Sequence, residues 1–118
     1  MVKTLLMTML LDFYGALLTE KQHNCFNLHY NEDMSLSEIA ETMDISRQAV
    51  RDLIVRAEST LKEIEDKTGL VERFSQRRVI MKDMETRLHE LAKITDGKAK
   101  EIAFRLFESL ENMKEIDN

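Results

Sequence analysis

The chain has 118 residues, of which 43% are hydrophobic and 33% charged, with three glycines and no proline or tryptophan. Turn residues are too scarce for a β-sandwich or barrel, and the composition excludes collagen-like, low-complexity and disulfide-scaffold proteins. The formal net charge of −5 argues against a protein whose whole surface binds polyphosphate, although it allows a basic face in one region. A single cysteine, Cys25, cannot form an internal disulfide, which favours a reducing, cytoplasmic setting. We therefore expect an all-α protein.

The first predicted helix covers the amino-terminal apolar segment. A lysine precedes the apolar run, as in a secretory signal, but Asp12 interrupts the run and no cleavage site of small residues follows. The run is also too short to cross a bilayer, so we expect no membrane insertion. Apolar side chains at spacings of three and four predict the buried face of an amphipathic helix, made of Leu6, Met9, Leu10, Phe13 and Leu17.

A second helix should begin after Thr19. Thr19 and Gln22 form a capping box, in which the side chain of each residue accepts a hydrogen bond from the backbone N–H of the other. The helix should continue to about Tyr30, and its apolar residues Cys25 and Phe26 should point inward.

Two further capped helices follow, and together they predict a helix-turn-helix. Ser35 and Glu38 repeat the capping box and should start a short helix that ends near Met43. Ser46 should cap a longer helix that continues to about Asp66. Two helices joined by about three residues are typical of this motif.

The apolar pattern around the turn supports the same motif. The small residue Ala40 lies near the expected helix crossing, and Asp44 occupies the turn, where aspartate tolerates a positive φ. The side chains expected between the two crossed helices are Ile39, Met43, Ile45, Val50 and Leu53.

The second helix of the motif should present polar and basic side chains outward. The amino-terminal end of such a helix enters the major groove, where arginine pairs with guanine and glutamine with adenine. Serine hydroxyls and helix N-terminal N–H groups bind phosphates, while Arg56 and Lys62, farther along, suit contacts with the DNA backbone. The predicted DNA-binding residues are Ser46, Arg47, Gln48, Arg51, Asp52 and Arg56, with Val55 on the same face.

The charge of this segment limits the expected affinity for DNA. Residues 46–62 hold four basic and two acidic side chains, and the preceding helix carries Glu38 and Glu41. Because affinity grows with the number of phosphates that a protein neutralises, one copy should bind weakly. A homodimer formed through the C-terminal helices would offer two half-sites.

Two more helices are predicted in residues 67–118, separated at Asp96-Gly97. Each carries apolar residues at heptad spacing, so the two seams could pair within one chain or between chains. The seams are Met81, Met84, Leu88 and Leu91 in the first helix, and Ala99, Ala103, Leu106, Leu110 and Met113 in the second. Further apolar side chains could pack on the helix-turn-helix domain of residues 1–66 or contact another chain: Phe74, Ile94, Ile102, Phe104 and Phe107.

Two segments carry a family resemblance. Residues 17–22 read LLTEKQ and residues 35–50 read SLSEIAETMDISRQAV, which resembles region four of bacterial sigma factors, the part that reads promoter DNA. With residues 11–14 and the helix through Glu65, the first 66 residues resemble the YlxM-type family of small helix-turn-helix proteins. The resemblance implies a regulatory DNA-binding protein that reads DNA through Arg47, Gln48, Arg51 and Asp52. It also implies a role in the signal recognition particle pathway.

Other functions find less support in the sequence. Cys25 and His29 are four residues apart, as metal ligands on a helix can be, but no second ligand pair accompanies them. The three glycines are too far apart for a phosphate loop and no nucleophile motif is present, so we expect no enzyme, catalytic residue, metal or cofactor. The main alternative is an interaction protein that contacts the protein or RNA of the signal recognition particle. Met81 and Met84 would suit an adaptable surface of that kind.

Overall fold

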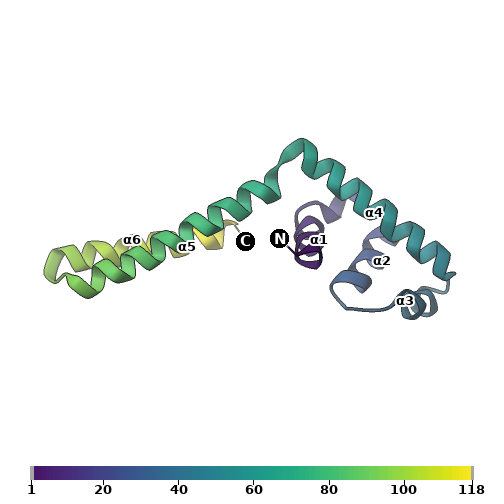
Figure 1. The fold of residues 1–118 in the computed structure, drawn as a ribbon, viewed down its shortest axis with the longest axis horizontal. Coiled ribbons are helices and arrows are strands. Elements are labelled where there is room, and N and C mark those ends of the chain that lie inside the picture. The colour runs from purple at the N-terminus through teal and green to yellow at the C-terminus, as the bar shows by residue number, and fades with distance from the viewer. Residues whose placement is uncertain (1, 118) are drawn as a thin grey trace. The chain divides into compact units, whose positions relative to one another are not determined.

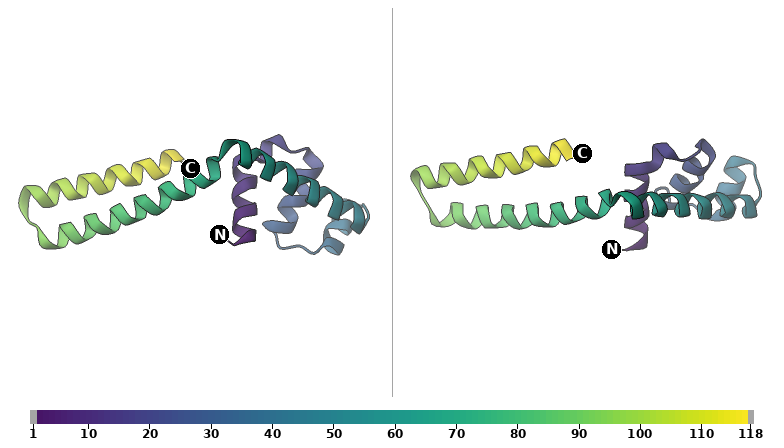
Figure 2. Two further views of the ribbon diagram at one scale, coloured as in Figure 1. Left: turned by 45° about the horizontal axis from the view of Figure 1, so that its top comes forward. Right: turned by 90° about the horizontal axis from the view of Figure 1, so that it is seen from above.

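The computed structural model describes residues 2–117, which are almost entirely helical and contain no strand (Figures 1 and 2). They form α1 (Lys3–Tyr14), a short 3-10 helix (Gly15–Leu17), α2 (Glu20–Tyr30), α3 (Leu36–Met43), α4 (Arg47–Thr68), α5 (Leu70–Ile94) and α6 (Gly97–Asp117). The all-α prediction is confirmed. The chain divides into two compact units, Met1–Glu72 and Arg73–Asn118. Within the described part of the chain, no helix has the length and apolar composition needed to span a membrane.

Both predicted capping boxes are present. Thr19 Oγ1 accepts the N–H of Gln22 at 3.2 Å, and Gln22 Oε1 accepts the N–H of Thr19 at 3.1 Å. Ser35 and Glu38 exchange the same two bonds, each at 3.1 Å. These side chains satisfy N–H groups that the first helical turn leaves free, so α2 and α3 begin where the sequence predicts.

Two apolar clusters hold the first unit together, and Cys25 and Phe26 point inward as predicted. One cluster joins α1, α2, α4 and the start of α5: Met7, Leu10, Leu11, Tyr14, Leu18, Phe26, Ala57, Leu61 and Val71. The other lies between α2, α3 and α4: Cys25, Ile39, Ala40, Val50 and Ile54, with Met43, Ile45 and Leu53 packed against them. The second cluster contains the residues predicted between the crossed helices.

The prediction of which face of α1 is buried is wrong, because the helix is rotated about its axis relative to the expected orientation. Phe13 and Leu17 are 39% and 67% exposed. The buried side chains of α1 are instead Met7, Leu10, Leu11 and Tyr14. Six of the seven residues from Leu5 to Leu11 are apolar, so a three-four spacing can be drawn through several different faces.

Two tyrosine hydroxyls connect α1 and α2 to α4 through hydrogen bonds. Tyr14 donates to Glu65 Oε1 at 2.6 Å and lies 2.5 Å from Thr68 Oγ1, and Tyr30 donates to Glu58. Burial, together with the neighbouring carboxylate, raises the pKa of both tyrosines above the ordinary value. Each hydroxyl therefore stays protonated and serves as a donor to α4.

The helix-turn-helix turns at Asp44, which has a φ of +56° and a ψ of +48°. The Asp44 N–H donates to Glu41 O at 3.3 Å, and the Ile45 N–H donates to Ala40 O at 3.1 Å. This pair of bonds is the Schellman motif that ends many helices. It redirects the chain so that only three residues separate the end of α3 from the start of α4.

We expect the stability of Asp44 variants to depend on how well the new residue tolerates a left-handed backbone. Asp44→Gly should raise the free energy of unfolding by up to about 1 kcal/mol, because glycine adopts this conformation without strain, whereas Asp44→Val should lower it by about 1–2 kcal/mol. Urea titrations of both variants beside the unsubstituted protein measure the difference. Equal stability of the two variants would contradict the assigned turn.

The second unit is a hairpin in which α5 and α6 lie side by side (Figure 2). Lys114 forms an ion pair with Glu85, and the ring of His89 lies 4.7 Å from that of Phe107. The buried apolar residues of the hairpin are Met81, Ala92, Ala103 and Leu110.

The predicted C-terminal seams are wrong in detail, because each predicted run divides between two faces. In α5, Met81 is buried and Leu88 half-buried, whereas Met84 and Leu91 are exposed. The α6 run divides in the same way, with Ala103 and Leu110 buried and Ala99, Leu106 and Met113 exposed. A paired Glu85 and Lys114 occupy seam positions that a search for apolar repeats passes over.

Candidate nucleic-acid interface

All six predicted DNA-binding residues lie on the exposed surface of the turn and of α4, between Ser46 and Arg56. The Ser46 Oγ accepts the N–H of Ala49 at 3.0 Å and so caps α4. This bond uses the oxygen as an acceptor and leaves the hydroxyl hydrogen free to donate to a phosphate. The positive end of the helix dipole lies at the same place and favours an anion.

Arg47 and Arg51 are one helical turn apart on α4. With Gln48 and with Leu36 of α3, they line an open hollow of about 380 Å³. Within residues 2–117, neither guanidinium takes part in a hydrogen bond or ion pair. Both side chains are therefore free to pair with a base edge or a phosphate without first breaking a contact in the protein.

Gln48 and Asp52 form a polar pair beside the arginines. Gln48 Nε2 donates to Asp52 Oδ1 at 3.0 Å, one turn along the exposed side of α4. The bond orients the amide and leaves the Gln48 carbonyl oxygen and the second Asp52 oxygen as acceptors. In the major groove, a carboxylate accepts from the amino group of cytosine, so this pair can discriminate between bases.

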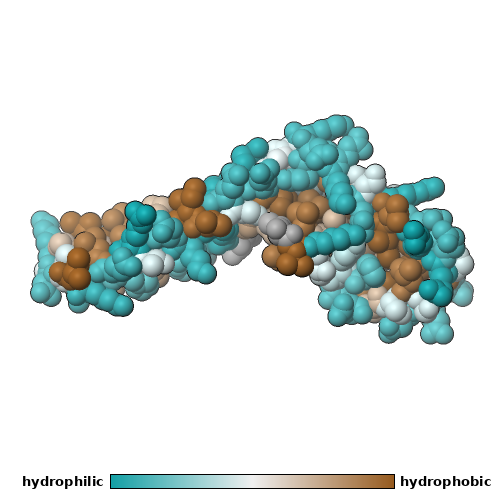
Figure 3. Space-filling model, in the orientation of Figure 1, coloured by the Kyte–Doolittle hydropathy of each residue, from teal (hydrophilic) through white to brown (hydrophobic). Residues whose placement is uncertain are grey.

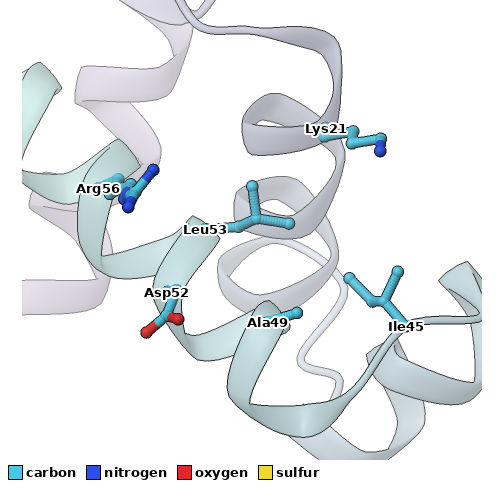
Figure 4. Close-up of a pocket in the computed structure, with 6 residues that line it drawn as sticks. All are labelled: Lys21, Ile45, Ala49, Asp52, Leu53 and Arg56. Atoms are coloured by element: carbon cyan, nitrogen blue, oxygen red, sulfur yellow. The ribbon is translucent and has the colours of Figure 1, made fainter.

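A second hollow borders the other side of α4 (Figure 4). It measures about 300 Å³, and Lys21 of α2 and Arg56 of α4 lie on either side of Leu53. The remaining lining residues are Ile45, Ala49 and Asp52. Sequence spacing did not single out Lys21, because only the packing of α2 on α4 brings it beside the turn. The basic surface therefore extends from α4 onto α2.

Acidic residues of α3 border the same surface. The hydrogen bonds from Ser35 lower the pKa of the exposed Glu38, so its carboxylate stays charged. Glu41 is also exposed. A phosphate backbone would be repelled along this side of α3, which leaves α4 and the N-terminal end of α2 as the approach for an anion.

The Cys25–His29 pair is not arranged as a metal site. Cys25 is buried with its Sγ 3.2 Å from Met43 Sδ, while His29 Nδ1 lies 3.1 Å from the carbonyl oxygen of Met34. The described residues contain no cluster of three or more histidine, cysteine, aspartate or glutamate side chains suited to a metal.

Residues 1–102 match the sequence model of the family UPF0122, described as "Putative helix-turn-helix protein, YlxM / p13 like". The match covers the whole first unit and most of the α5–α6 hairpin.

Individual relatives are also similar to this chain. A UPF0122 protein of Desulforamulus reducens is 57% identical over 65 residues, which are 55% of this chain and 56% of that protein. One from Thermoanaerobacter sp. is 56% identical over 72 residues, which are 61% and 62% of the two chains, so these matches span little more than half of the relatives. One from Halalkalibacterium halodurans is 44% identical over 113 residues, covering 95% and 97%.

Proposed function

Because the chain belongs to the UPF0122 family of YlxM/p13-like helix-turn-helix proteins, we propose that it is a non-enzymatic, cytoplasmic regulator that binds DNA. The N-terminal end of α4 enters the major groove. Arg47, Gln48, Arg51 and Asp52 contact base edges, while Ser46, Arg56 and Lys21 contact phosphates.

The observation that supports this proposal best is the state of the two arginines at the start of α4. Arg47 and Arg51 are exposed and hold no partner among residues 2–117, although the chain is rich in carboxylates that could pair with them. Elsewhere, exposed arginines such as Arg87 and Arg105 pair with an acidic residue four positions earlier. Unpaired guanidinium groups at the end of a recognition helix suit bidentate pairing with guanine.

The experiment that tests DNA binding is selection from random duplexes followed by titration of the enriched sequence at several salt concentrations. We expect one motif to be enriched and the affinity to fall with salt, with a log–log slope close to the number of phosphates contacted. Selection without enrichment over a denatured sample would refute the proposal.

We further propose that two copies bind together through the C-terminal helices of residues 67–118. The two reading helices would then bind two half-sites and neutralise twice as many phosphates. A paired protein should accordingly prefer a repeated motif to a single one, and the spacing of the selected half-sites reports this directly.

A second candidate function is contact with the signal recognition particle, through its protein or its RNA. The family resemblance implies this partner, and the exposed apolar side chains of the second unit, such as Met84 and Phe104, favour a contact with protein. A pull-down with the purified protein and RNA components tests it. Retention no greater than with a control helical protein would exclude this function.

A further inference from the structure

The α5–α6 hairpin carries a second apolar seam in addition to the one inside it. Along α5 the positions are Ile80, Met84, Arg87, Leu91 and Ile94, at spacings of 4, 3, 4 and 3, and all are apolar except Arg87, which pairs with Asp83. Along α6 they are Ala99, Ile102, Leu106, Ser109, Met113 and Ile116, at spacings of 3, 4, 3, 4 and 3, and all are apolar except Ser109. These intervals keep side chains on one stripe of a helix, as in coiled coils and helix bundles.

The two stripes lie on the same face of the hairpin. A groove of about 360 Å³ runs between them and is lined by residues of both stripes together with Leu88 and Leu110. Hydrophobic side chains reach the surface over α5 and α6 in the space-filling view (Figure 3). The opposite side of the hairpin also exposes Val79 and Phe104 but is richer in charge. Its charged residues include Lys82, Lys93, Glu108, Glu111 and Glu115.

The area of this face matches what a specific dimer buries. Eight isoleucine, leucine and methionine side chains of the two stripes are between 40% and 84% exposed. At roughly 100 Å² each they offer on the order of 800 Å² per copy, the usual contribution of one partner to a stable interface. The largest apolar patch on a monomer is typically smaller, roughly 300–600 Å².

We propose that this face of the hairpin, made of the two stripes, packs against the same face of a second copy and forms an antiparallel four-helix bundle. The inference rests on the proposed pairing of two copies for DNA binding and assigns the residues that make it. A two-fold axis parallel to the helices places α5 of one copy against α6 of the other, so each α5 stripe meets an α6 stripe.

Charge at the edge of the face favours this arrangement over α5 packing on α5. Within the hairpin, His89 lies beside Phe107, which sets the level at which residues of α5 and α6 meet. The two-fold axis preserves these levels, so Glu90 at the edge of one α5 faces Arg105 of the partner subunit. Both residues are exposed, and Arg105, which pairs with Glu101 of its own helix, has further guanidinium donors for Glu90. Opposite charges at the edges of a bundle seam stabilise pairing and fix its orientation.

The solution mass without DNA tests the dimer. We expect the unsubstituted protein to have twice the chain mass, and Leu106→Glu to have the mass of one chain while keeping its helical circular dichroism. Phe104→Glu is the matched control: Phe104 and Leu106 are 51% and 50% exposed, but Phe104 borders a different hollow with His89 and Ala92. This variant should remain a dimer.

A monomeric unsubstituted protein, or a Leu106→Glu variant that stays dimeric, would overturn the proposal. The first result would mean that a different protein covers the face. Because no DNA is present, either failure is distinguishable from a failure of DNA binding, which the α4 residues test separately.

Cross-linking tests the arrangement of the helices. Glu90→Cys and Arg105→Cys place thiols on opposite edges of one hairpin, too far apart to be joined within a chain by a short bismaleimide. The double variant should give a covalent dimer and each single variant should not. Absence of the dimer from the double variant, or its presence in a single variant, would refute the packing of α5 on α6 of the partner.

Discussion

Phe26→Ala is expected to lower the free energy of unfolding by about 3–5 kcal/mol, which is the usual loss for a buried phenylalanine. Phe26 is fully buried among the residues that join α1, α2 and α4, and its ring lies 4.7 Å from the ring of Tyr30. Removing the ring takes away its apolar burial and leaves a cavity that helices fixed by their neighbours cannot close. Urea titration followed by circular dichroism measures the loss.

The control for this prediction is Phe13→Ala. Phe13 is 39% exposed and lies 6.1 Å, between ring centroids, from Tyr14. Because water already reaches the ring and little cavity forms, we expect a loss of about 1 kcal/mol or less. The comparison also separates the observed phase of α1 from the one that spacing predicted, in which Phe13 pointed inward. Similar losses in the two variants would contradict the observed core.

Arg51→Ala is expected to weaken binding of the selected duplex by about 5- to 150-fold, equivalent to about 1–3 kcal/mol for a bidentate pair with guanine. Arg51 lies one turn along α4 from Arg47, and its guanidinium is exposed and unpaired within residues 2–117. Its removal should therefore change the interaction with DNA and leave the folded protein unaffected. Gel-shift titration at fixed salt, together with urea titration, measures both quantities.

Two variants distinguish a base contact from a general effect of charge. Arg51→Lys keeps the charge but loses the planar fork of donors, so it should bind nearly as weakly as Arg51→Ala if Arg51 reads a base. Lys67→Ala removes an exposed charge at the far end of the same helix, where Lys67 pairs with Glu63, and should bind normally. Unchanged affinity in Arg51→Ala would refute the assignment of Arg51 to the groove.

The features that the sequence predicted best are those determined locally. Thr19, Ser35 and Ser46 bind N–H groups within three residues, so each helix start could be located from a few adjacent side chains. The helix-turn-helix was predictable because caps, turn and apolar spacing all indicate the same boundaries.

The features that the sequence did not reveal depend on contacts between distant segments. Lys21 joins the basic surface only because α2 packs beside α4. The division of the C-terminal runs into an inner and an outer stripe depends on Glu85, which occupies an inner position of α5 because Lys114 of α6 pairs with it. A search for apolar repeats does not find a charged residue such as Glu85 at a core position. Its partner, Lys114, lies 29 positions away in the sequence.

The Glu85–Lys114 pair also fixes how the two helices of the hairpin are aligned. Sliding α6 by one heptad would keep apolar residues facing apolar residues, so hydrophobic contacts alone permit several alignments. In the slipped form the Glu85 carboxylate would face the ring of Phe107 and lose the Lys114 ammonium as its partner. The Glu85 side chain is only 15% exposed, so the slipped hairpin would have to leave this charge unpaired and largely out of water. This ion pair, together with the Arg77–Asp117 pair between the same two helices, thus favours one position of α6 along α5, a choice that the repeating hydrophobic residues leave open.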